Sequence, residues 1–123
     1  MAKSIKSILK KGLGFKVTGS LWMECENERF FGPGRVELLE RIADAGSING
    51  AAKQMGMSYK KAWEMVNSLN AQTTRPVVIP QVGGEKGGGS TITEEAWQLI
   101  KYHRLLRKRF ATFLKNETNR MKI

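Results

Sequence analysis

The chain has 123 residues, a formal net charge of +10 and an isoelectric point near 10.1. Its length suits one domain with a real core, and its 41% hydrophobic and 26% charged residues argue against wholesale disorder. The single cysteine excludes an intrachain disulfide and a cysteine-rich metal site. Neither a membrane-spanning apolar run nor an apolar signal segment is present, so we expect a cytoplasmic protein.

The excess of positive charge favours a polyanionic partner, but it is distributed unevenly. Residues 101–123 carry +7, whereas residues 31–75 carry only +2. A nucleic-acid interface built on the middle of the chain would therefore use few cations, or it would also draw on the two ends.

The first 31 residues predict an arm followed by a β-hairpin. Residues 1–14 are rich in lysine and are expected to form a basic, flexible arm. Apolar and polar side chains alternate over residues 15–24, as in a half-buried strand. Glu26 and Asn27 would form the turn, and residues 29–31 the returning strand.

Turn and cap residues then divide the chain into three predicted helices, at about residues 35–45, 48–55 and 59–70. Gly46 and Gly56 end the first two, while Ser47 and Ser58 are suited to cap the second and third. The inward face of the third helix is predicted to consist of Ala62, Trp63, Val66 and Leu69. Two short helices joined by a tight turn are typical of a helix-turn-helix.

A glycine-rich loop at residues 83–90 separates two short β-like runs, 77–79 and 90–93, which predict a hairpin wing. A phosphate-binding P-loop is excluded because Gly89, not lysine, precedes Ser90. Glycines at the tip would let the main chain approach a sugar-phosphate backbone, and Lys86 would supply charge. The alternative is a disordered hairpin tip.

The last predicted helix begins after Thr93, a suitable N-cap, and runs to about Asn116, leaving residues 117–123 as a tail. Its apolar side chains follow a heptad-like spacing, which predicts a dimer interface. The predicted interface residues are Leu99, His103, Leu106, Phe110 and Phe113. His103, the sole histidine, is expected to be packed or at the interface rather than a metal ligand.

The recognition helix of a helix-turn-helix presents its N-terminal residues to base edges, and its amide groups favour phosphate. The predicted DNA contacts are Ser47, Ser58, Tyr59, Lys60, Lys61, Glu64, Lys86, Gly87 and Gly88. Alternatively, the two lysines of the helix could lie on a solvated face and Tyr59 could pack at the helix start. The basic run over residues 104–109 could be a second nucleic-acid surface or the solvated side of a dimer helix.

The motifs resemble a known family. Residues 35–93 contain Gly46-Ser-Ile, Ala51-Ala-Lys, Ser58-Tyr-Lys-Lys-Ala-Trp63, Asn67-Ser-Leu-Asn70 and Gly83-Gly-Glu-Lys-Gly-Gly-Gly-Ser90. Together these are similar to the N-terminal winged-helix domain of ModE-type molybdate-responsive regulators, which are related to LysR-type domains. The resemblance covers about residues 15–115.

The resemblance implies an α+β fold, mainly α: a winged helix-turn-helix, here at residues 15–116, with an N-terminal β-hairpin and a long C-terminal dimerisation helix. It implies homodimers that bind a two-fold related operator in double-stranded DNA. Full-length members continue into oxyanion-binding domains that hold the molybdate site, so we expect this chain not to bind molybdate itself. An unknown effector or partner protein remains possible.

The sequence therefore predicts a dimeric, sequence-specific transcriptional regulator. The main alternative is a nonspecific nucleoid-associated or RNA-binding basic protein, which the charge of residues 101–123 keeps open. A protein-interaction module is a further alternative. An enzyme is not expected, because the sequence has no G-x-S-x-G, H-E-x-x-H or Cys/His catalytic pattern, and no cofactor or metal site is predicted.

Overall fold

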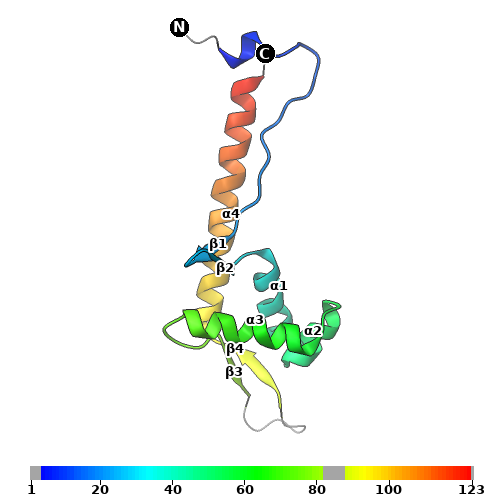
Figure 1. The fold of residues 1–123 in the computed structure, drawn as a ribbon, viewed down its shortest axis with the longest axis vertical. Coiled ribbons are helices and arrows are strands. Elements are labelled where there is room, and N and C mark those ends of the chain that lie inside the picture. The colour runs from blue at the N-terminus through cyan, green and yellow to red at the C-terminus, as the bar shows by residue number, and fades with distance from the viewer. Residues whose placement is uncertain (1–3, 82–87, 123) are drawn as a thin grey trace. The chain divides into compact units, whose positions relative to one another are not determined.

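The computed structural model describes residues 4–81 and 88–122. Its fold is α+β and mainly α, as predicted: a winged helix-turn-helix with a β-hairpin before it and a long helix after it (Figure 1). The elements are η1 (Ile5–Ser7), β1 (Met23–Cys25), β2 (Glu28–Phe31), α1 (Pro33–Ala45), α2 (Ile48–Gln54), α3 (Tyr59–Gln72), β3 (Val78–Pro80), β4 (Ser90–Ile92) and α4 (Glu94–Met121).

Two compact units share these elements. The first, which we call the head, comprises residues 22–103, and the second, the arm unit, comprises residues 1–21 and 104–123. Helix α4 is continuous in the chain and contributes residues to both units. We describe each unit by itself.

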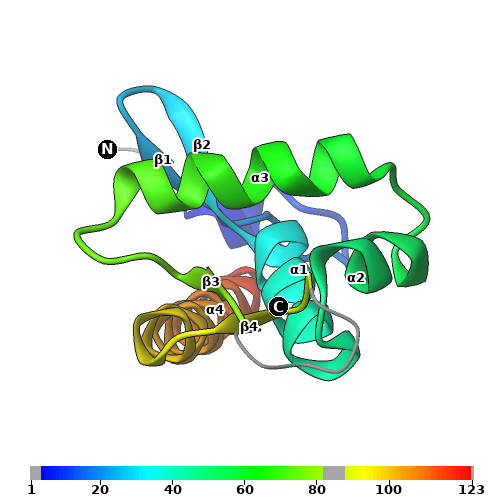
Figure 2. The ribbon, with the colours of Figure 1, turned by 90° about the horizontal axis from the view of Figure 1, so that it is seen from below.

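The core of the head is built on α1. Leu38, Leu39 and Ile42 of this helix are fully buried, and they share one cluster with residues of α2, α3 and the wing. The buried face of α2 consists of Ala51 and Ala52, whose small side chains let neighbouring helices approach closely. Figure 2 shows α1, α2 and α3 arranged as a three-helix cluster.

The predicted cap residues are confirmed. Gly46 ends α1 in the left-handed conformation, with φ 76°, and its N–H donates to Ile42 O at 2.8 Å. Gly56 also has a positive φ, 65°. Because left-handed backbone is strained for residues with a Cβ, these two glycines fix the ends of the helices.

Strands β3 and β4 form the wing as an antiparallel pair, with Val78 opposite Ile92. The Gln81 N–H donates to Gly89 O at 2.9 Å, which extends the pairing toward the loop. The Ser90 N–H donates to Gly46 O at 2.9 Å. The start of β4, at the loop end of the wing, is thereby joined to the end of α1.

Asn70, near the end of α3, connects that helix to the wing. Its Oδ1 accepts hydrogen bonds from the Val77 and Val78 N–H groups at 2.8 and 3.4 Å, and its Nδ2 donates to Val78 O at 3.2 Å. One side chain thus satisfies three main-chain groups of the wing strand.

We expect Asn70→Ala to lower the free energy of unfolding by about 2 kcal/mol, because part-buried main-chain groups lose their partners. Asn67→Ala is the matched control, since Asn67 lies exposed on the same helix. Urea denaturation of both variants measures the difference. Equal stabilities would show that Asn70 is not a structural link.

The N-terminal hairpin is shorter than predicted. Strand β1 covers only residues 23–25, and the turn at Glu26 and Asn27 has φ values of 51° and 69°. The strand prediction was wrong for residues 15–22, which have no strand partner in the structure. In the arm unit, the Val17 N–H instead donates to Thr118 Oγ1 on α4 at 2.9 Å. A strand needs a neighbouring strand to pair with, and alternating apolar and polar residues do not by themselves provide one.

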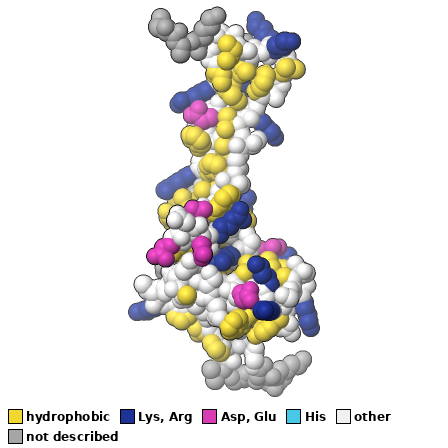
Figure 3. Space-filling model, in the orientation of Figure 1, with side chains coloured by type: hydrophobic (Ala, Val, Ile, Leu, Met, Phe, Trp, Pro, Cys, Tyr) yellow, Lys and Arg dark blue, Asp and Glu magenta, His cyan; other side chains and the backbone are white. Residues whose placement is uncertain are grey.

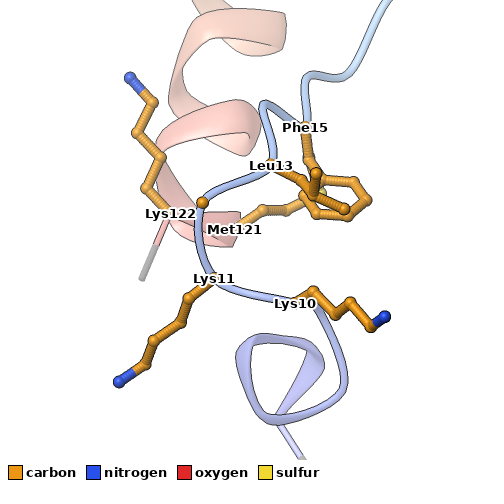
Figure 4. A pocket seen from close by; sticks show the side chains of 7 residues that line it. Lys10, Lys11, Leu13, Phe15, Met121 and Lys122 are labelled. Carbon is orange, nitrogen blue, oxygen red and sulfur yellow. The ribbon is translucent and has the colours of Figure 1, made fainter.

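In the arm unit, the chain before Leu21 runs beside α4 (Figure 1). A Cβ added to Gly19 would lie 3.0 Å from Phe110 Cζ, which shows how closely the two segments pack. Farther along, a hollow of about 490 Å³ lies between the arm and the end of α4. Figure 4 shows Leu13, Phe15 and Met121 pointing toward one another there, while the neighbouring lysine side chains extend away.

Helix α4 continues to Met121, beyond the predicted end at Asn116. Residues 117–121 contain neither glycine nor proline, and Glu117 forms an ion pair with Arg120 at 3.5 Å. Nothing local therefore stops the helix at residue 116. Among the described residues, no helix, α4 included, is both long and apolar enough to cross a membrane.

Candidate nucleic-acid interface

The N-terminal turn of α3 is open to solvent. Ser58, Lys60, Lys61 and Glu64 are exposed, and Tyr59 is 52% exposed. No described part of the chain covers this turn, so the predicted contact residues of the third helix are brought together on an accessible surface.

The spacing of buried residues in α3 explains this exposure. Ala62, Val66 and Leu69 recur at helical spacing and are buried. The prediction that Trp63 faces inward was wrong, because its side chain is 47% exposed. At about 100° per residue, Trp63 lies roughly 100° around the helix from Ala62, so it falls beside the buried stripe.

The same turn is electrostatically suited to an anion. Ser58 Oγ accepts a hydrogen bond from the Lys61 N–H at 3.1 Å, as an N-cap. There is no acidic residue in the first turn of α3. The partial positive charge of the helix terminus and the side chains of Lys60 and Lys61 therefore act in the same direction.

Two substitutions at Ser58 separate its capping role from a role in DNA binding. Ser58→Ala should lower the free energy of unfolding by about 1 kcal/mol, because the cap is lost. Ser58→Asp should keep the stability near that of the parent chain, since aspartate also caps, while its charge repels phosphate. Urea denaturation and DNA titration of both variants measure the two roles. DNA affinity unchanged by Ser58→Asp would contradict a phosphate close to this turn.

The remaining predicted DNA contacts lie elsewhere in the head. Gly88 is exposed and has φ 72°, whereas Lys86 and Gly87 lie outside the described residues. Ser47 is half-buried, and its Oγ accepts a hydrogen bond from the Gly50 N–H at 2.9 Å. Ser47 is therefore observed as the N-cap of α2.

The predicted dimer residues of α4 fall into two groups. His103 is 1% exposed, and its ring meets that of Phe31 edge-on, with the centroids 5.7 Å apart. Leu99 packs against the same core. In contrast, Leu106 and Phe110 are half-buried and Phe113 is 55% exposed.

The structure therefore places His103 in the core of its own head, so its side chain has almost no surface to offer to a partner subunit. Of the two expected places for His103, packed or at the interface, the structure shows the packed one, because a single helix can pack one end of its apolar stripe internally.

Arg35 is a cation that the sequence analysis did not single out. Its Nη1 donates to Phe30 O at 2.9 Å and to Ser68 Oγ at 3.3 Å, and burial lowers the pKa of its guanidinium. It still carries a positive charge at neutral pH. No sequence signal indicates that Arg35 links these elements, because its hydrogen-bond partners come from β2 and α3. Within residues 4–81 and 88–122, no group of His, Cys, Asp and Glu is suited to hold a metal ion.

The chain is similar to several regulators over most of its length. It is 38% identical to the transcriptional regulator ModE of Haemophilus influenzae over 88 residues, which cover 72% of this chain and 34% of that protein. It is 37% identical to the DNA-binding transcriptional dual regulator ModE of Escherichia coli K12 over 86 residues, covering 70% and 33%. The molybdenum-pterin-binding protein MopA of Rhodobacter capsulatus is 45% identical over 69 residues, covering 56% and 26%.

Among solved structures, full-length LTTR LysG from Corynebacterium glutamicum matches with a TM-score of 0.48 and 21% identity, over 73% of this chain and 29% of that one. No protein-family model matches the chain. The chain spans about a third of the length of the two ModE proteins. The resemblance predicted from the motifs is confirmed over about 70% of the chain.

Proposed function

We propose that this chain, whose homologues are ModE transcriptional regulators, is a sequence-specific DNA-binding regulator that acts as a homodimer in the cytoplasm. The observation that carries the proposal is the exposed N-terminal turn of α3, where a capped helix terminus and two lysines meet. The surface suits a polyanion, and the two-helix geometry suits a major groove.

In this proposal α3 enters the major groove with its first turns. Tyr59, Lys60, Lys61 and Glu64 are the side chains that can reach base edges, because all four are exposed on that part of the helix. The amide groups around Ser58 would face phosphate. The wing would lie along the adjacent backbone, with Gly88 allowing a close approach.

We assign dimerisation to two apolar side chains of α4, the half-buried Leu106 and the exposed Phe113. Leu106 and Phe113 are seven residues apart and so lie on one side of the helix. Figure 3 shows hydrophobic side chains gathered along the visible face of the arm unit. A two-fold dimer would present its reading helices to half-sites about 34 Å apart, one turn of duplex DNA.

A selection of bound fragments from genomic DNA at low and moderate salt tests the proposal. A sequence-specific regulator should recover a two-fold related motif that persists at moderate salt. Recovery without sequence preference, together with a steep loss of binding as salt rises, would contradict it.

That contrary result would favour a second candidate, a nonspecific nucleic-acid-binding protein. The exposed side chains of Arg107, Lys108 and Arg109 on α4 are the observation that supports it. Competition between duplex DNA and RNA distinguishes the two functions, because the second candidate should bind both with similar affinity.

The proposal includes no molybdate site in this chain. Equilibrium dialysis of the purified chain against molybdate checks this part separately. Saturable binding of one molybdate per chain would contradict it without affecting the assignment of α3 to DNA.

A further inference from the structure

A second surface of the head has the chemistry of a small-molecule site. A hollow of about 390 Å³ lies where the β1–β2 hairpin, the start of α1 and the first turns of α3 meet. Its apolar side chains include Trp22, Phe31 and Met65, and its cations are Arg29, Arg35 and Lys61. None of the described residues that line it is acidic. The volume falls in the range of pockets that hold small molecules.

The cations are held in different ways. Arg35 is held in place by the hydrogen bonds that it donates to Phe30 O and Ser68 Oγ. The Arg29 guanidinium lies over the Trp22 ring, 4.2 Å from its centroid. Lys61 reaches the hollow from the third residue of α3. Fixed and adjustable positive charges thus converge on one small volume from three elements.

The apolar walls decide which kind of anion fits best. A phosphate of the DNA backbone or an inorganic anion is strongly hydrated. It would interact with the cations but would gain nothing from the apolar side chains. Trp22 is 38% exposed, and a Cβ added to Gly32 would lie 3.1 Å from the Trp22 Cβ, so Gly32 packs closely against the base of this side chain. A flat apolar body stacked on this ring would remove apolar surface from water.

We infer that this hollow binds a small organic anion with a flat apolar body, such as an aromatic carboxylate. The carboxylate would face Arg29, Arg35 and Lys61, and the ring would lie against Trp22 and Met65. Outside the lining of the hollow, Trp22 Nε1 donates a hydrogen bond to Glu24 Oε2 at 3.3 Å. That bond orients the indole.

Binding would also affect DNA, a consequence that rests on the proposed function. Lys61 belongs both to the hollow and to the exposed turn of α3. An anion that neutralises Lys61 would weaken contact with duplex DNA, and DNA would weaken binding of the anion by the same factor. The hollow is thus placed to let a metabolite regulate the reading helix.

Titration of the full chain with benzoate, benzamide and acetate tests the inference without DNA. Amide and indole N–H chemical shifts in NMR spectra report which residues respond. We expect saturable shifts at Trp22 and at residues 29–35 and 61–65, with benzoate binding about tenfold more tightly than benzamide or acetate. Benzamide binding equally well would overturn the role of the cations. Acetate binding equally well would overturn the role of the apolar walls.

Arg29→Gln should weaken benzoate binding about threefold, as expected for an exposed charge. Arg41→Gln is the matched control, since Arg41 is an arginine of the same head that pairs with Glu37 outside the hollow. Equal effects of the two variants, or shifts scattered over the chain, would overturn the site. Thermal melting of both variants confirms that they fold.

The effect of benzoate on DNA affinity is a separate measurement. If benzoate binds in the hollow, DNA affinity should fall as benzoate is added to the parent chain, and less so for Arg29→Gln. A chain that binds benzoate here but no DNA would refute the proposed function and leave the site intact. A chain that binds DNA specifically but not benzoate would refute the site alone.

Discussion

Replacing Lys60 and Lys61 together with alanine is expected to lower affinity for specific DNA about 100-fold at moderate salt. Both side chains are exposed on the first turn of α3, next to the helix terminus. Each can contact a phosphate or a base edge, and a good base contact is worth about 1–3 kcal/mol. If both contact phosphates, the slope of log K against log salt should become shallower by about 2.

Arg107→Ala with Lys108→Ala is the matched control for this experiment, because it removes the same charge from exposed positions of α4. Fluorescence anisotropy with specific and unrelated duplexes, each at several salt concentrations, separates the two surfaces. If the α4 variant loses more affinity than the α3 variant on both duplexes, the reading helix is wrongly assigned. The nonspecific alternative would then be favoured.

The helix-turn-helix could be predicted closely because its boundaries depend on local chemistry. Gly46 and Gly56 adopt backbone conformations that other residues rarely adopt, and Ser47 and Ser58 satisfy amide groups three residues ahead. These signals act within a few residues of the chain. The predicted contact surface on α3 followed from them, since the cap and the buried stripe together determine which side chains stay exposed.

Predictions that depended on a partner segment were less accurate. Residues 15–21 alternate like a strand, but this segment packs on α4, where the Val17 N–H donates to Thr118 Oγ1 across 101 positions of sequence. His103 has the spacing of a dimer residue, yet Phe31 covers it within the head. Periodicity shows that a face will be covered and does not show which segment covers it.

The links between elements could not be predicted from the sequence at all. In the sequence, Asn70 is an ordinary polar residue near a helix end. Its structural role comes from the wing strand that folds back beside it and bonds to its side chain. The hollow beside Lys61 likewise exists only where the hairpin, α1 and α3 meet. Both depend on contacts between segments that local propensity does not encode.

The largest expected effect on assembly comes from Leu106→Ser combined with Phe113→Ser. In a two-fold dimer each substitution occurs twice, so four apolar contacts are lost. Burial of each such side chain is worth about 1.5–3 kcal/mol. We therefore expect the dimer dissociation constant to rise at least about 100-fold, with sedimentation equilibrium showing monomers.

Phe110 is a poorer choice for this test, because its ring packs against Gly19 and its loss would also disturb the arm unit. Ile5→Ser with Ile8→Ser serves as the control, since Ile5 of η1 and Ile8 directly after it are both exposed. Their loss removes apolar surface from outside α4. This control should remain dimeric.

The same pair of variants tests how dimerisation contributes to DNA binding. In a dimer, binding of the first head to one half-site holds the second head near the other half-site, at an effective concentration of about millimolar. The dimer therefore binds a full operator more tightly than a single head does. The monomeric variant should lose affinity for a two-half-site duplex but keep that for a single half-site, since α3 is unchanged. If it remains dimeric in sedimentation, Leu106 and Phe113 of α4 are not the dimer interface. If it becomes monomeric yet binds the full operator as tightly as the parent chain, each head reads DNA alone and the two-fold operator is wrong.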